Sequence, residues 1–393
     1  MNGDEPGSTG DRLRIALLST PQLPVPPPRY AGTERVVAAL AHELARRGHA
    51  VTLLAPGDSR PECVLIPTVR QSLWSTGYRG DVSAHISISL ARAWAVHEQF
   101  DVIHSHVETL GLLVARLCPT PVVSTLHGRL DGSGVPELLD EFDDVPLVAI
   151  SDSQRRWSPR ANWVATIHHG LPFADAPLRT EAGTYLALVG RVAPEKGIAE
   201  AIELAGMTGL RVRLAAKAYD DAERALFERI VRPAIDDGVV DYLGEVGPGE
   251  RDELLGGALA TVMLGAWPEP FGLVAIESLA LGTPVIARRA GALPELIEHH
   301  VDGFLVDDLA EARLAVDRAA GLDRAAIRRR ARTRFSVERM TDAYEAVYRA
   351  LVAARRPAPV RTTTRAALGV LATDGAAART ADPEPVAADP RAG

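Results

Sequence analysis

The sequence predicts an α/β protein that contains two doubly wound domains in tandem. Short apolar segments suited to buried parallel strands alternate with segments of helical periodicity, first within residues 13–167 and again within residues 185–306. A polar stretch with proline and glycine, residues 175–183, separates the two series, as expected at a domain boundary. The length of 393 residues is enough for two domains of ordinary size.

The composition is typical of a globular protein with a sizeable core. It is 47% hydrophobic and 24% charged, and the formal net charge of −8 provides no overall basic surface for nucleic acid. No apolar run reaches the roughly 18 residues of a membrane-spanning helix, and the N-terminus lacks a secretory signal pattern. Cys63 and Cys118 lack the spacing of metal ligands. We therefore expect a cytoplasmic protein with no transmembrane segment and no nucleic-acid partner.

The first half begins with a strand, a stiff loop and a helix. Residues 13–19 form an apolar run, five prolines between residues 21 and 28 exclude regular structure, and Gly32 stands at the entrance of a helix that ends near Gly48. A nicotinamide-binding domain would need a G-x-G-x-x-G turn in place of this proline-rich loop, which argues against a dehydrogenase. The further strands of this half are predicted at residues 50–55, 101–106, 122–126, 146–150 and 163–167.

Histidines follow two of these strands. His104 and His106 end one strand and His127 follows the next, where side chains face the crevice of a parallel sheet. A histidine in such a place is more often structural, and we assign His104 and His106 no direct role. The segment after residue 150 starts a helix, with Asp152 as its N-cap.

The second half repeats the alternation. Its strands are predicted at residues 185–189, 211–215, 239–243, 260–264, 285–287 and 303–306, and its helices at 197–205, 221–235 and 271–281. Residues 324–334 contain six arginines and are expected to form a helix with a solvated face; peripheral contact with an anionic membrane is left open but not favoured. A last helix is predicted at 336–354. Residues 357–393 have little apolar periodicity and are expected to be disordered.

Two cations flank a turn after the first strand of the second half. Arg191 and Lys196 stand on either side of a proline, and Gly197 permits a close backbone approach where the next helix starts. Guanidinium and ammonium groups beside a helix start can bind an anion such as a diphosphate. A solvated basic turn is the alternative.

Two prolines precede a second helix start. Pro268 and Pro270 disfavour helix around Glu269, whereas the residues from Phe271 onward are good helix formers. In a continuous helix Glu269 and Glu277 would be about 12 Å apart, which suits the two ends of a sugar–diphosphate–ribose unit. The residues around Glu277 are apolar, and a buried carboxylate without a partner is costly. The alternative is an ordinary loop-to-helix transition with solvated carboxylates.

These segments resemble the donor-site signature of retaining glycosyltransferases of the GT-B fold, especially glycosyltransferase family 4. The signature has two glutamates with seven residues between them in an E-P-F-G-L context, followed by G-T-P-V-I, and both parts stand here, at residues 269–277 and 282–286. The family's G-R-x-x-x-x-K-G turn matches residues 190–197. The resemblance implies two Rossmann-like domains that face a central cleft: an acceptor-side domain at 12–170 and a nucleotide-sugar donor domain at 171–335, with a helix at 336–354 that crosses back to the first domain.

The resemblance also implies roles for single residues. Arg191 and Lys196 would bind the donor diphosphate, Glu269 the sugar hydroxyls and Glu277 the ribose hydroxyls. His127 would reach the transferred sugar, and with Arg191, Lys196 and Glu269 it completes the expected catalytic set.

Backbone contacts to the donor are implied as well. The backbone at Val246 would contact the edge of the base, and Gly32 would contact the donor phosphate more weakly, because Ala31 replaces the first glycine of the family's G-G-x-E element. His169 stands where an asparagine is common, and we assign it no role. The implied donor-binding residues are Gly32, Arg191, Lys196, Val246, Glu269, Phe271, Gly272, Leu273 and Glu277.

The implied function is transfer of a sugar, with retention, from a nucleoside-diphosphate sugar to a hydroxyl on a small molecule, a glycan or a lipid-linked acceptor. Protein cations can take the diphosphate charge and no metal-ligand cluster is evident, so we expect catalysis without a metal or a cofactor. The same site could instead serve a sugar phosphorylase or a nucleotide-sugar epimerase, or belong to a non-catalytic nucleotide-sugar-binding protein. Assays with inorganic phosphate, or without an acceptor, would separate the two enzymatic alternatives.

Overall fold

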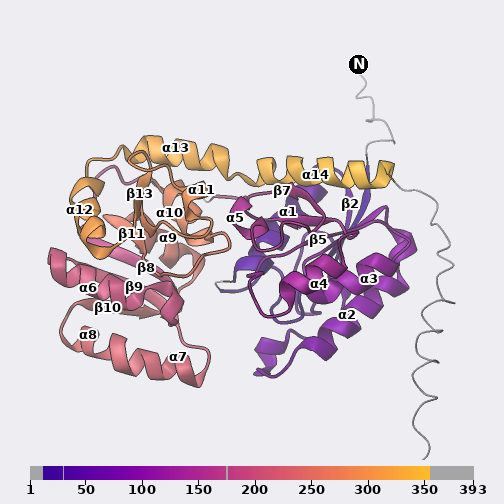
Figure 1. Ribbon diagram of the computed structural model, residues 1–393, viewed down its shortest axis with the longest axis horizontal. Helices are drawn as coiled ribbons and strands as arrows, with labels where there is room; N and C mark the ends of the chain where they lie inside the picture. Colours follow the sequence, from indigo (N-terminus) through magenta and orange to yellow (C-terminus); the bar gives the residue numbers. More distant parts are fainter. Residues whose placement is uncertain (1–11, 30, 174–175, 355–393) are drawn as a thin grey trace, which may run out of the picture. The chain divides into compact units, whose positions relative to one another are not determined.

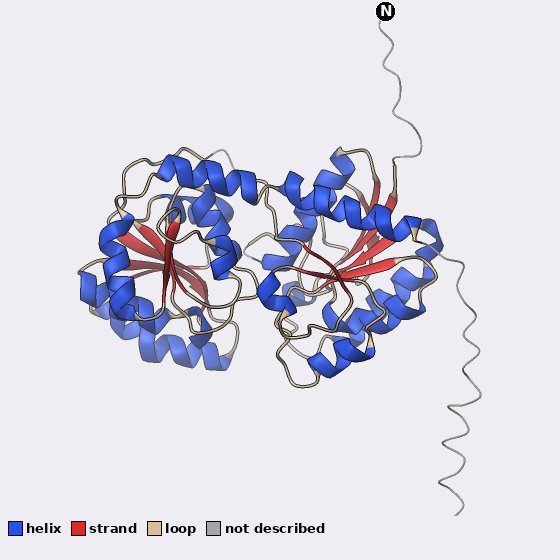
Figure 2. Cartoon of the chain, turned by 45° about the horizontal axis from the view of Figure 1, so that its top comes forward, coloured by secondary structure: helices blue, strands red, loops and turns tan. Residues whose placement is uncertain are grey.

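The computed structural model describes residues 12–29, 31–173 and 176–354. These residues form two parallel β-sheets that are covered by helices (Figure 1, Figure 2). This arrangement confirms the predicted α/β class with two doubly wound halves. The predicted disordered tail, residues 357–393, lies outside the described residues.

The first half is a seven-stranded parallel sheet in the order β3-β2-β1-β4-β5-β6-β7. Its strands are β1 (Arg14–Leu18), β2 (Ala50–Ala55), β3 (Val64–Pro67), β4 (Val102–Ser105), β5 (Val122–Thr125), β6 (Leu147–Ala149) and β7 (Trp163–Thr166). Its main helices are α1 (Gly32–Arg46), α2 (Ser83–Ala95), α3 (Leu112–Leu117), α4 (Val135–Glu141) and α5 (Asp152–Arg155). The strands predicted from apolar runs are confirmed, while β3, α2, α3 and α4 are additional.

The second half is a six-stranded parallel sheet in the order β10-β9-β8-β11-β12-β13. Its strands are β8 (Tyr185–Arg191), β9 (Arg211–Lys217), β10 (Val240–Gly244), β11 (Ala260–Met263), β12 (Val285–Arg288) and β13 (Gly303–Val306). Its helices are α6 (Ile198–Thr208), α7 (Asp221–Leu226), α8 (Arg232–Asp236), α9 (Pro248–Gly256), α10 (Leu273–Ala280), α11 (Leu293–Leu296), α12 (Leu309–Ala319) and α13 (Arg324–Arg334).

In each sheet the order of the strands reverses at the first strand of that half. β1 lies between β2 and β4, and β8 lies between β9 and β11. The carboxyl ends of strands at such a switch point leave a crevice in which open α/β sheets bind ligands. The proline-rich loop follows β1, while Arg191 ends β8 and Lys196 lies in the turn that follows it.

Two predicted helices of the second half have different limits. The single helix expected at 221–235 is divided into α7 and α8 by the π-helical segment Phe227–Val231, and Pro233, which has no N–H, stands in the first turn of α8. Helix α10 begins at Leu273 rather than Phe271, because the preceding residue, Gly272, has a φ of 103° that lies outside the helical range.

The cap of α5 also differs from the prediction. Ser151, not Asp152, is the N-cap: its hydroxyl accepts a hydrogen bond from the Gln154 N–H at 3.0 Å. The Asp152 carboxylate instead accepts a hydrogen bond from the Thr166 hydroxyl at 2.7 Å.

The arginines of α13 are largely structural, which corrects the expectation of a solvated face. Arg324 is buried and donates to the carbonyl oxygens of Arg179, Gly256 and Ala258. Arg334 donates in the same way to the carbonyls of residues 295 and 296. These guanidinium groups attach α13 to the second half. None of the helices in the described residues is long and apolar enough to cross a membrane.

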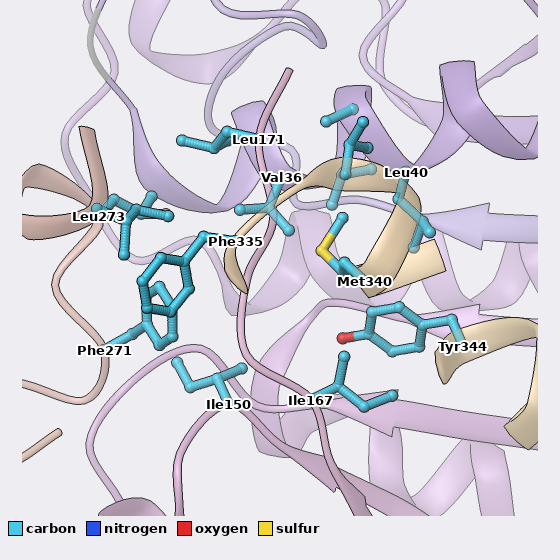
Figure 3. Close-up of a cluster of buried hydrophobic side chains, with 14 of the residues drawn as sticks. Val36, Leu40, Ile150, Ile167, Leu171, Phe271, Leu273, Phe335, Met340 and Tyr344 are labelled. Atoms are coloured by element: carbon cyan, nitrogen blue, oxygen red, sulfur yellow. The ribbon is translucent and has the colours of Figure 1, made fainter. Parts of the chain in front are cut away.

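Helix α14 (Val337–Ala353) packs against α1 and β4 of the first half. Met340, Tyr344 and Tyr348 recur every four residues and are buried on one face of the helix. Figure 3 shows Met340 and Tyr344 in one apolar cluster with Val36 of α1. The same cluster contains Phe271 of the second half, which lies just before α10. The two halves therefore share part of their hydrophobic core.

Candidate active site

A cavity of about 470 Å³ is lined by residues of both halves, at the carboxyl ends of the strands. It brings together every predicted site residue except Glu277, although these residues are far apart in the sequence. The predicted residues that line it are Gly32, His127, Arg191, Lys196, Val246, Glu269, Phe271, Gly272 and Leu273.

Two helix starts meet at this cavity. Helix α1 begins at Gly32 and α10 begins at Leu273, and a Cβ on Gly32 would lie 3.5 Å from Leu273 Cδ1. Each start carries unpaired N–H groups and a partial positive charge, so their proximity favours an anionic ligand. This arrangement supports a diphosphate at the place where the sequence predicts one.

The predicted cations lie beside carboxylates. Lys196 Nζ is 2.8 Å from Glu269 Oε2, and Arg191 contacts Glu195 at 2.6 Å and Glu223 at 2.8 Å. The turn that holds them packs tightly on the end of β11. Gly197 has a φ of 70°, and a Cβ at this residue would lie 2.3 Å from the backbone nitrogen of Gly265, just after β11. The contact between Lys196 and Glu269 joins the two signature segments in one site.

A third cation of the cavity was missed by the sequence analysis. Lys217 ends β9, where it is the register partner of Arg191, and its Nζ is 2.8 Å from Glu245. Burial opposes ionisation of Glu245, but hydrogen bonds from Lys217 and Arg29 outweigh it and lower the pKa of this carboxyl. Lys196 and Lys217 are the only lysines in the sequence, and both line the cavity. The rarity of lysine in an arginine-rich chain is the signal that could have identified Lys217.

The segment that carries His127 is held on both sides. The Glu108 carboxylate accepts hydrogen bonds from the His127 N–H at 3.1 and 3.3 Å. The Gln154 amide donates to the carbonyl oxygens of Leu126 at 2.8 Å and Gly128 at 2.9 Å. Glu108 has a φ of 53°, an uncommon conformation for a residue other than glycine. The sequence carries no local signal for these contacts, because they join separate loops.

The imidazole of His127 belongs to a group of buried rings. His106 Nδ1 lies 2.9 Å from His127 Nε2, and the ring of His169 stacks on His127 with centroids 5.2 Å apart. Burial lowers the pKa of His127 to about 3 and lowers those of His106 and His169 well below their usual value. These imidazoles are therefore neutral. His106 and His169, to which the sequence assigns no role, both contact the predicted catalytic histidine.

Glu277 lies outside the lining of the cavity. Its side chain is only 4% exposed and forms ion pairs with Arg35 of α1 and, at 3.5 Å, with Arg251 of α9. The burial that the apolar sequence around Glu277 suggested is confirmed, and its charge is compensated by arginines from both halves. A contact between Glu277 and ribose hydroxyls stays a prediction.

The carboxyl of Glu108 makes the stability of the protein dependent on pH. Burial raises its pKa to about 7 from a reference value of 4.5, against the lowering effect of hydrogen bonds from the His127 and Gly128 N–H groups. Between these two values the folded state binds more protons than the unfolded state, so the free energy of unfolding should fall as the pH rises, by at most about 3 kcal/mol.

We expect Glu108→Gln to remove this part of the pH dependence, because glutamine keeps an acceptor for the His127 N–H but cannot ionise. Urea unfolding of the wild type and the variant at several pH values between 4.5 and 7.5 checks the prediction. Glu98→Gln, at an exposed residue, is the control. Parallel pH profiles for the wild type and Glu108→Gln would contradict it.

Known proteins are similar to this chain in both sequence and fold. The family model described as Glycosyl transferases group 1 matches residues 175–322, and that described as Glycosyltransferase Family 4 matches residues 30–202. The D-inositol 3-phosphate glycosyltransferase of Saccharomonospora viridis is 30% identical over an alignment that covers 87% of this chain and 95% of that protein.

Two solved structures are similar over almost their full lengths. AviGT4, a glycosyltransferase involved in avilamycin A biosynthesis, is 25% identical with a TM-score of 0.63, over 87% of this chain and 98% of that one. HepE of Anabaena, in complex with UDP-glucose, shares the fold at 16% identity with a TM-score of 0.68, over 86% of this chain and 100% of that one. The signature segments, their meeting in one cavity and these relatives lead to one conclusion: the chain belongs to glycosyltransferase family 4 and has the GT-B fold.

Proposed function

We propose that this glycosyltransferase transfers a sugar from a nucleoside-diphosphate sugar to a hydroxyl acceptor with retention of configuration. The observation that carries the proposal is the 2.8 Å contact between Lys196 and Glu269 in a cavity that also contains Arg191 and two helix starts. The cations and helix starts suit a diphosphate, and the adjacent carboxylate suits the hydroxyls of the attached sugar.

The proposed catalysis consists of charge stabilisation. As the bond between the sugar and the diphosphate breaks, negative charge grows on the leaving diphosphate, where Arg191, Lys196 and the starts of α1 and α10 stabilise it. Positive charge grows on the sugar ring, where the Glu269 carboxylate lies. Binding of the diphosphate to Lys196 also releases Glu269 from its ion pair, so that this carboxylate becomes available to the sugar.

The environment of Glu34, a carboxyl that the first half of the chain contributes to the cavity, favours retention by attack from the face of the leaving group. Glu34 lines the cavity but is 7% exposed, and it accepts a hydrogen bond from the Thr20 hydroxyl at 2.8 Å. Burial raises the pKa of this carboxyl, and one of its oxygens is occupied by the hydrogen bond from Thr20. We infer that the donor phosphate, rather than a side chain, takes the proton of the acceptor. The anomeric configuration of the product, read by proton NMR, tests retention, and an inverted product would refute it.

The relatives suggest the class of donor and acceptor. HepE, which has the same fold, was solved in complex with UDP-glucose, and the Saccharomonospora viridis relative is named a D-inositol 3-phosphate glycosyltransferase. We therefore propose a nucleotide sugar as donor and a small polyol or glycan hydroxyl as acceptor. A cytoplasmic location is part of this proposal, since nucleotide sugars are the co-substrate.

A thermal-shift screen with UDP, GDP and ADP, and with UDP-glucose, GDP-mannose and ADP-glucose, tests the donor class. A ligand at a hundred times its Kd should stabilise the folded protein by about 2.7 kcal/mol. A diphosphate is expected to raise the melting temperature far more than the corresponding nucleoside. No shift with any nucleotide would contradict a nucleotide-sugar donor.

Turnover is expected to persist in excess EDTA. Arg191, Lys196 and the two helix starts supply the positive charge that a divalent ion would otherwise provide. Within the described residues, no group of three or more histidine, cysteine, aspartate or glutamate side chains is placed to hold a metal ion. A loss of turnover that Mg²⁺ or Mn²⁺ restores would contradict this prediction.

A further inference from the structure

The start of α5 contacts a loop of the cavity that belongs to the other half of the chain. Ser151 is fully buried, and its hydroxyl donates a hydrogen bond to the Pro270 carbonyl of the second half at 2.8 Å. The same hydroxyl oxygen accepts a hydrogen bond from the Gln154 N–H at 3.0 Å. Its single proton is therefore committed to Pro270. Pro270 directly follows Glu269, the carboxylate that is proposed to face the sugar.

The side chain of Gln154 joins the start of α5 to the first half. Its Nε2 donates to the carbonyl oxygens of Leu126 at 2.8 Å and Gly128 at 2.9 Å, on either side of His127. Its Oε1 accepts a hydrogen bond from the Ile150 N–H at 3.0 Å. Both amide hydrogens and the amide oxygen are thus paired in a buried place, which holds the start of α5 firmly against the segment of His127.

A carboxylate of the second half also holds the start of α5. Glu295 of α11 accepts hydrogen bonds from the Asp152 N–H at 2.9 Å and from the Ser153 N–H at 2.7 Å. Such a carboxylate is favourable at a helix start, where N–H groups lack partners within the helix. These contacts attach α5 to the second half and keep the Ser151 hydroxyl within reach of the Pro270 carbonyl.

The loop that carries Glu269 depends on contacts from outside. Pro268 and Pro270 have no N–H, so the loop has few backbone donors with which to form a turn of its own. The Ala292 N–H, from within the second half, donates to the Glu269 carbonyl at 2.8 Å. The Ser151 hydroxyl supplies a donor to the next carbonyl, that of Pro270. The backbone around Glu269 is therefore held between the two halves.

We propose that Ser151 is a positioning residue that, by holding the Pro270 carbonyl, sets the Glu269 carboxylate against the donor sugar. This inference rests on the proposed role of Glu269 in sugar transfer. Ser151 does not line the cavity, so it acts through Glu269 and not by contact with the substrate. Because Gln154 attaches Ser151 to the segment of His127, the hydrogen bond also aligns the Glu269 loop with the half that is predicted to bind the acceptor.

Ser151→Ala removes the hydroxyl and tests the proposal. Turnover is measured with whichever of UDP-glucose, GDP-mannose or ADP-glucose the wild type uses. We expect kcat to fall about tenfold, because the carboxylate is no longer held in place when charge develops on the sugar. Nucleoside diphosphate affinity should not weaken, since Arg191 and Lys196 are unchanged. Ser151→Thr keeps the hydroxyl and should retain a kcat within about threefold of wild type.

A matched control accounts for the loss of a helix cap. Ser151→Ala also removes the N-cap of α5, and Asp308→Ala removes the N-cap of α12, which lies outside the cavity. Both variants should lower the melting temperature, because each leaves a helix start without its capping oxygen. Only Ser151→Ala should lower kcat.

The double variant Ser151→Ala with Glu269→Gln decides whether Ser151 acts through Glu269. If it does, Ser151→Ala should change kcat by less than about twofold in the Glu269→Gln background. Additive losses would overturn the proposal, as would a wild-type kcat in Ser151→Ala, and both results leave the proposed sugar transfer intact. A wild-type kcat in Glu269→Gln would overturn the proposed role of Glu269 and this inference with it.

Discussion

Glu269→Gln is expected to lower kcat by roughly a hundredfold while nucleoside diphosphate affinity stays the same or increases. The Glu269 carboxylate is 2.8 Å from Lys196 Nζ and therefore competes with the diphosphate for this cation. Glutamine keeps the shape of the side chain and removes the competing charge. The carboxylate is needed when positive charge develops on the sugar ring, so its loss should appear in turnover.

Turnover assays and calorimetric titration of UDP, GDP or ADP, whichever binds, separate the two effects. Glu298→Gln is the matched control, because Glu298 also forms an ion pair, with Arg330, but does not line the cavity. It should change neither quantity. If Glu269→Gln loses nucleoside diphosphate affinity and keeps its kcat, the proposed placement of the donor sugar beside Glu269 is wrong.

Lys196→Ala is expected to weaken nucleoside diphosphate binding by about a hundredfold, because a charge-assisted hydrogen bond is worth about 1.5–3 kcal/mol. The substitution also leaves the Glu269 carboxylate facing the diphosphate, which adds repulsion. The double variant Lys196→Ala with Glu269→Gln should therefore bind the diphosphate more tightly than Lys196→Ala alone. Affinity for the nucleoside without phosphates should change little in any of these variants.

Calorimetry of nucleoside and nucleoside diphosphate with the single and double variants measures this coupling. Arg232→Ala is the control for loss of a cation, since Arg232 is exposed on α8 and pairs with Glu228. Strictly additive effects of the two substitutions would show that Lys196 and Glu269 do not interact in the binding reaction. Equal weakening of nucleoside binding and nucleoside diphosphate binding would show that Lys196 does not contact the phosphates.

The accuracy of the strand predictions has a physical cause. Strands such as β1 and β12 are buried on both faces, so their apolar character is continuous in the sequence. β3 lies at the edge of its sheet and was missed, because its apolar run, Val64 to Ile66, has only three residues and ends at Pro67. Helix α2 was missed because its three serines and two isoleucines weaken the local helical signal.

The sequence by itself determined the α/β class and the division into two halves, and it predicted which segments form the donor site. These features depend on local properties: apolar runs that mark buried strands, prolines and glycines that end or start helices, and cations spaced around a turn. Arg191, Lys196 and Glu269 were predicted from these segments together with the family resemblance, and all three line one cavity.

Only the tertiary structure decided which partners these residues have. Lys196 meets Glu269, Glu277 meets Arg35, and His106 meets His127, each across a long separation in sequence. The chain contains many carboxylates and arginines of equal local character, and nothing in their neighbouring residues indicates which pairs will meet. Folding selects the pairs by bringing the carboxyl ends of strands from different parts of the chain to one edge of each sheet, where burial makes the choice of partner energetically important.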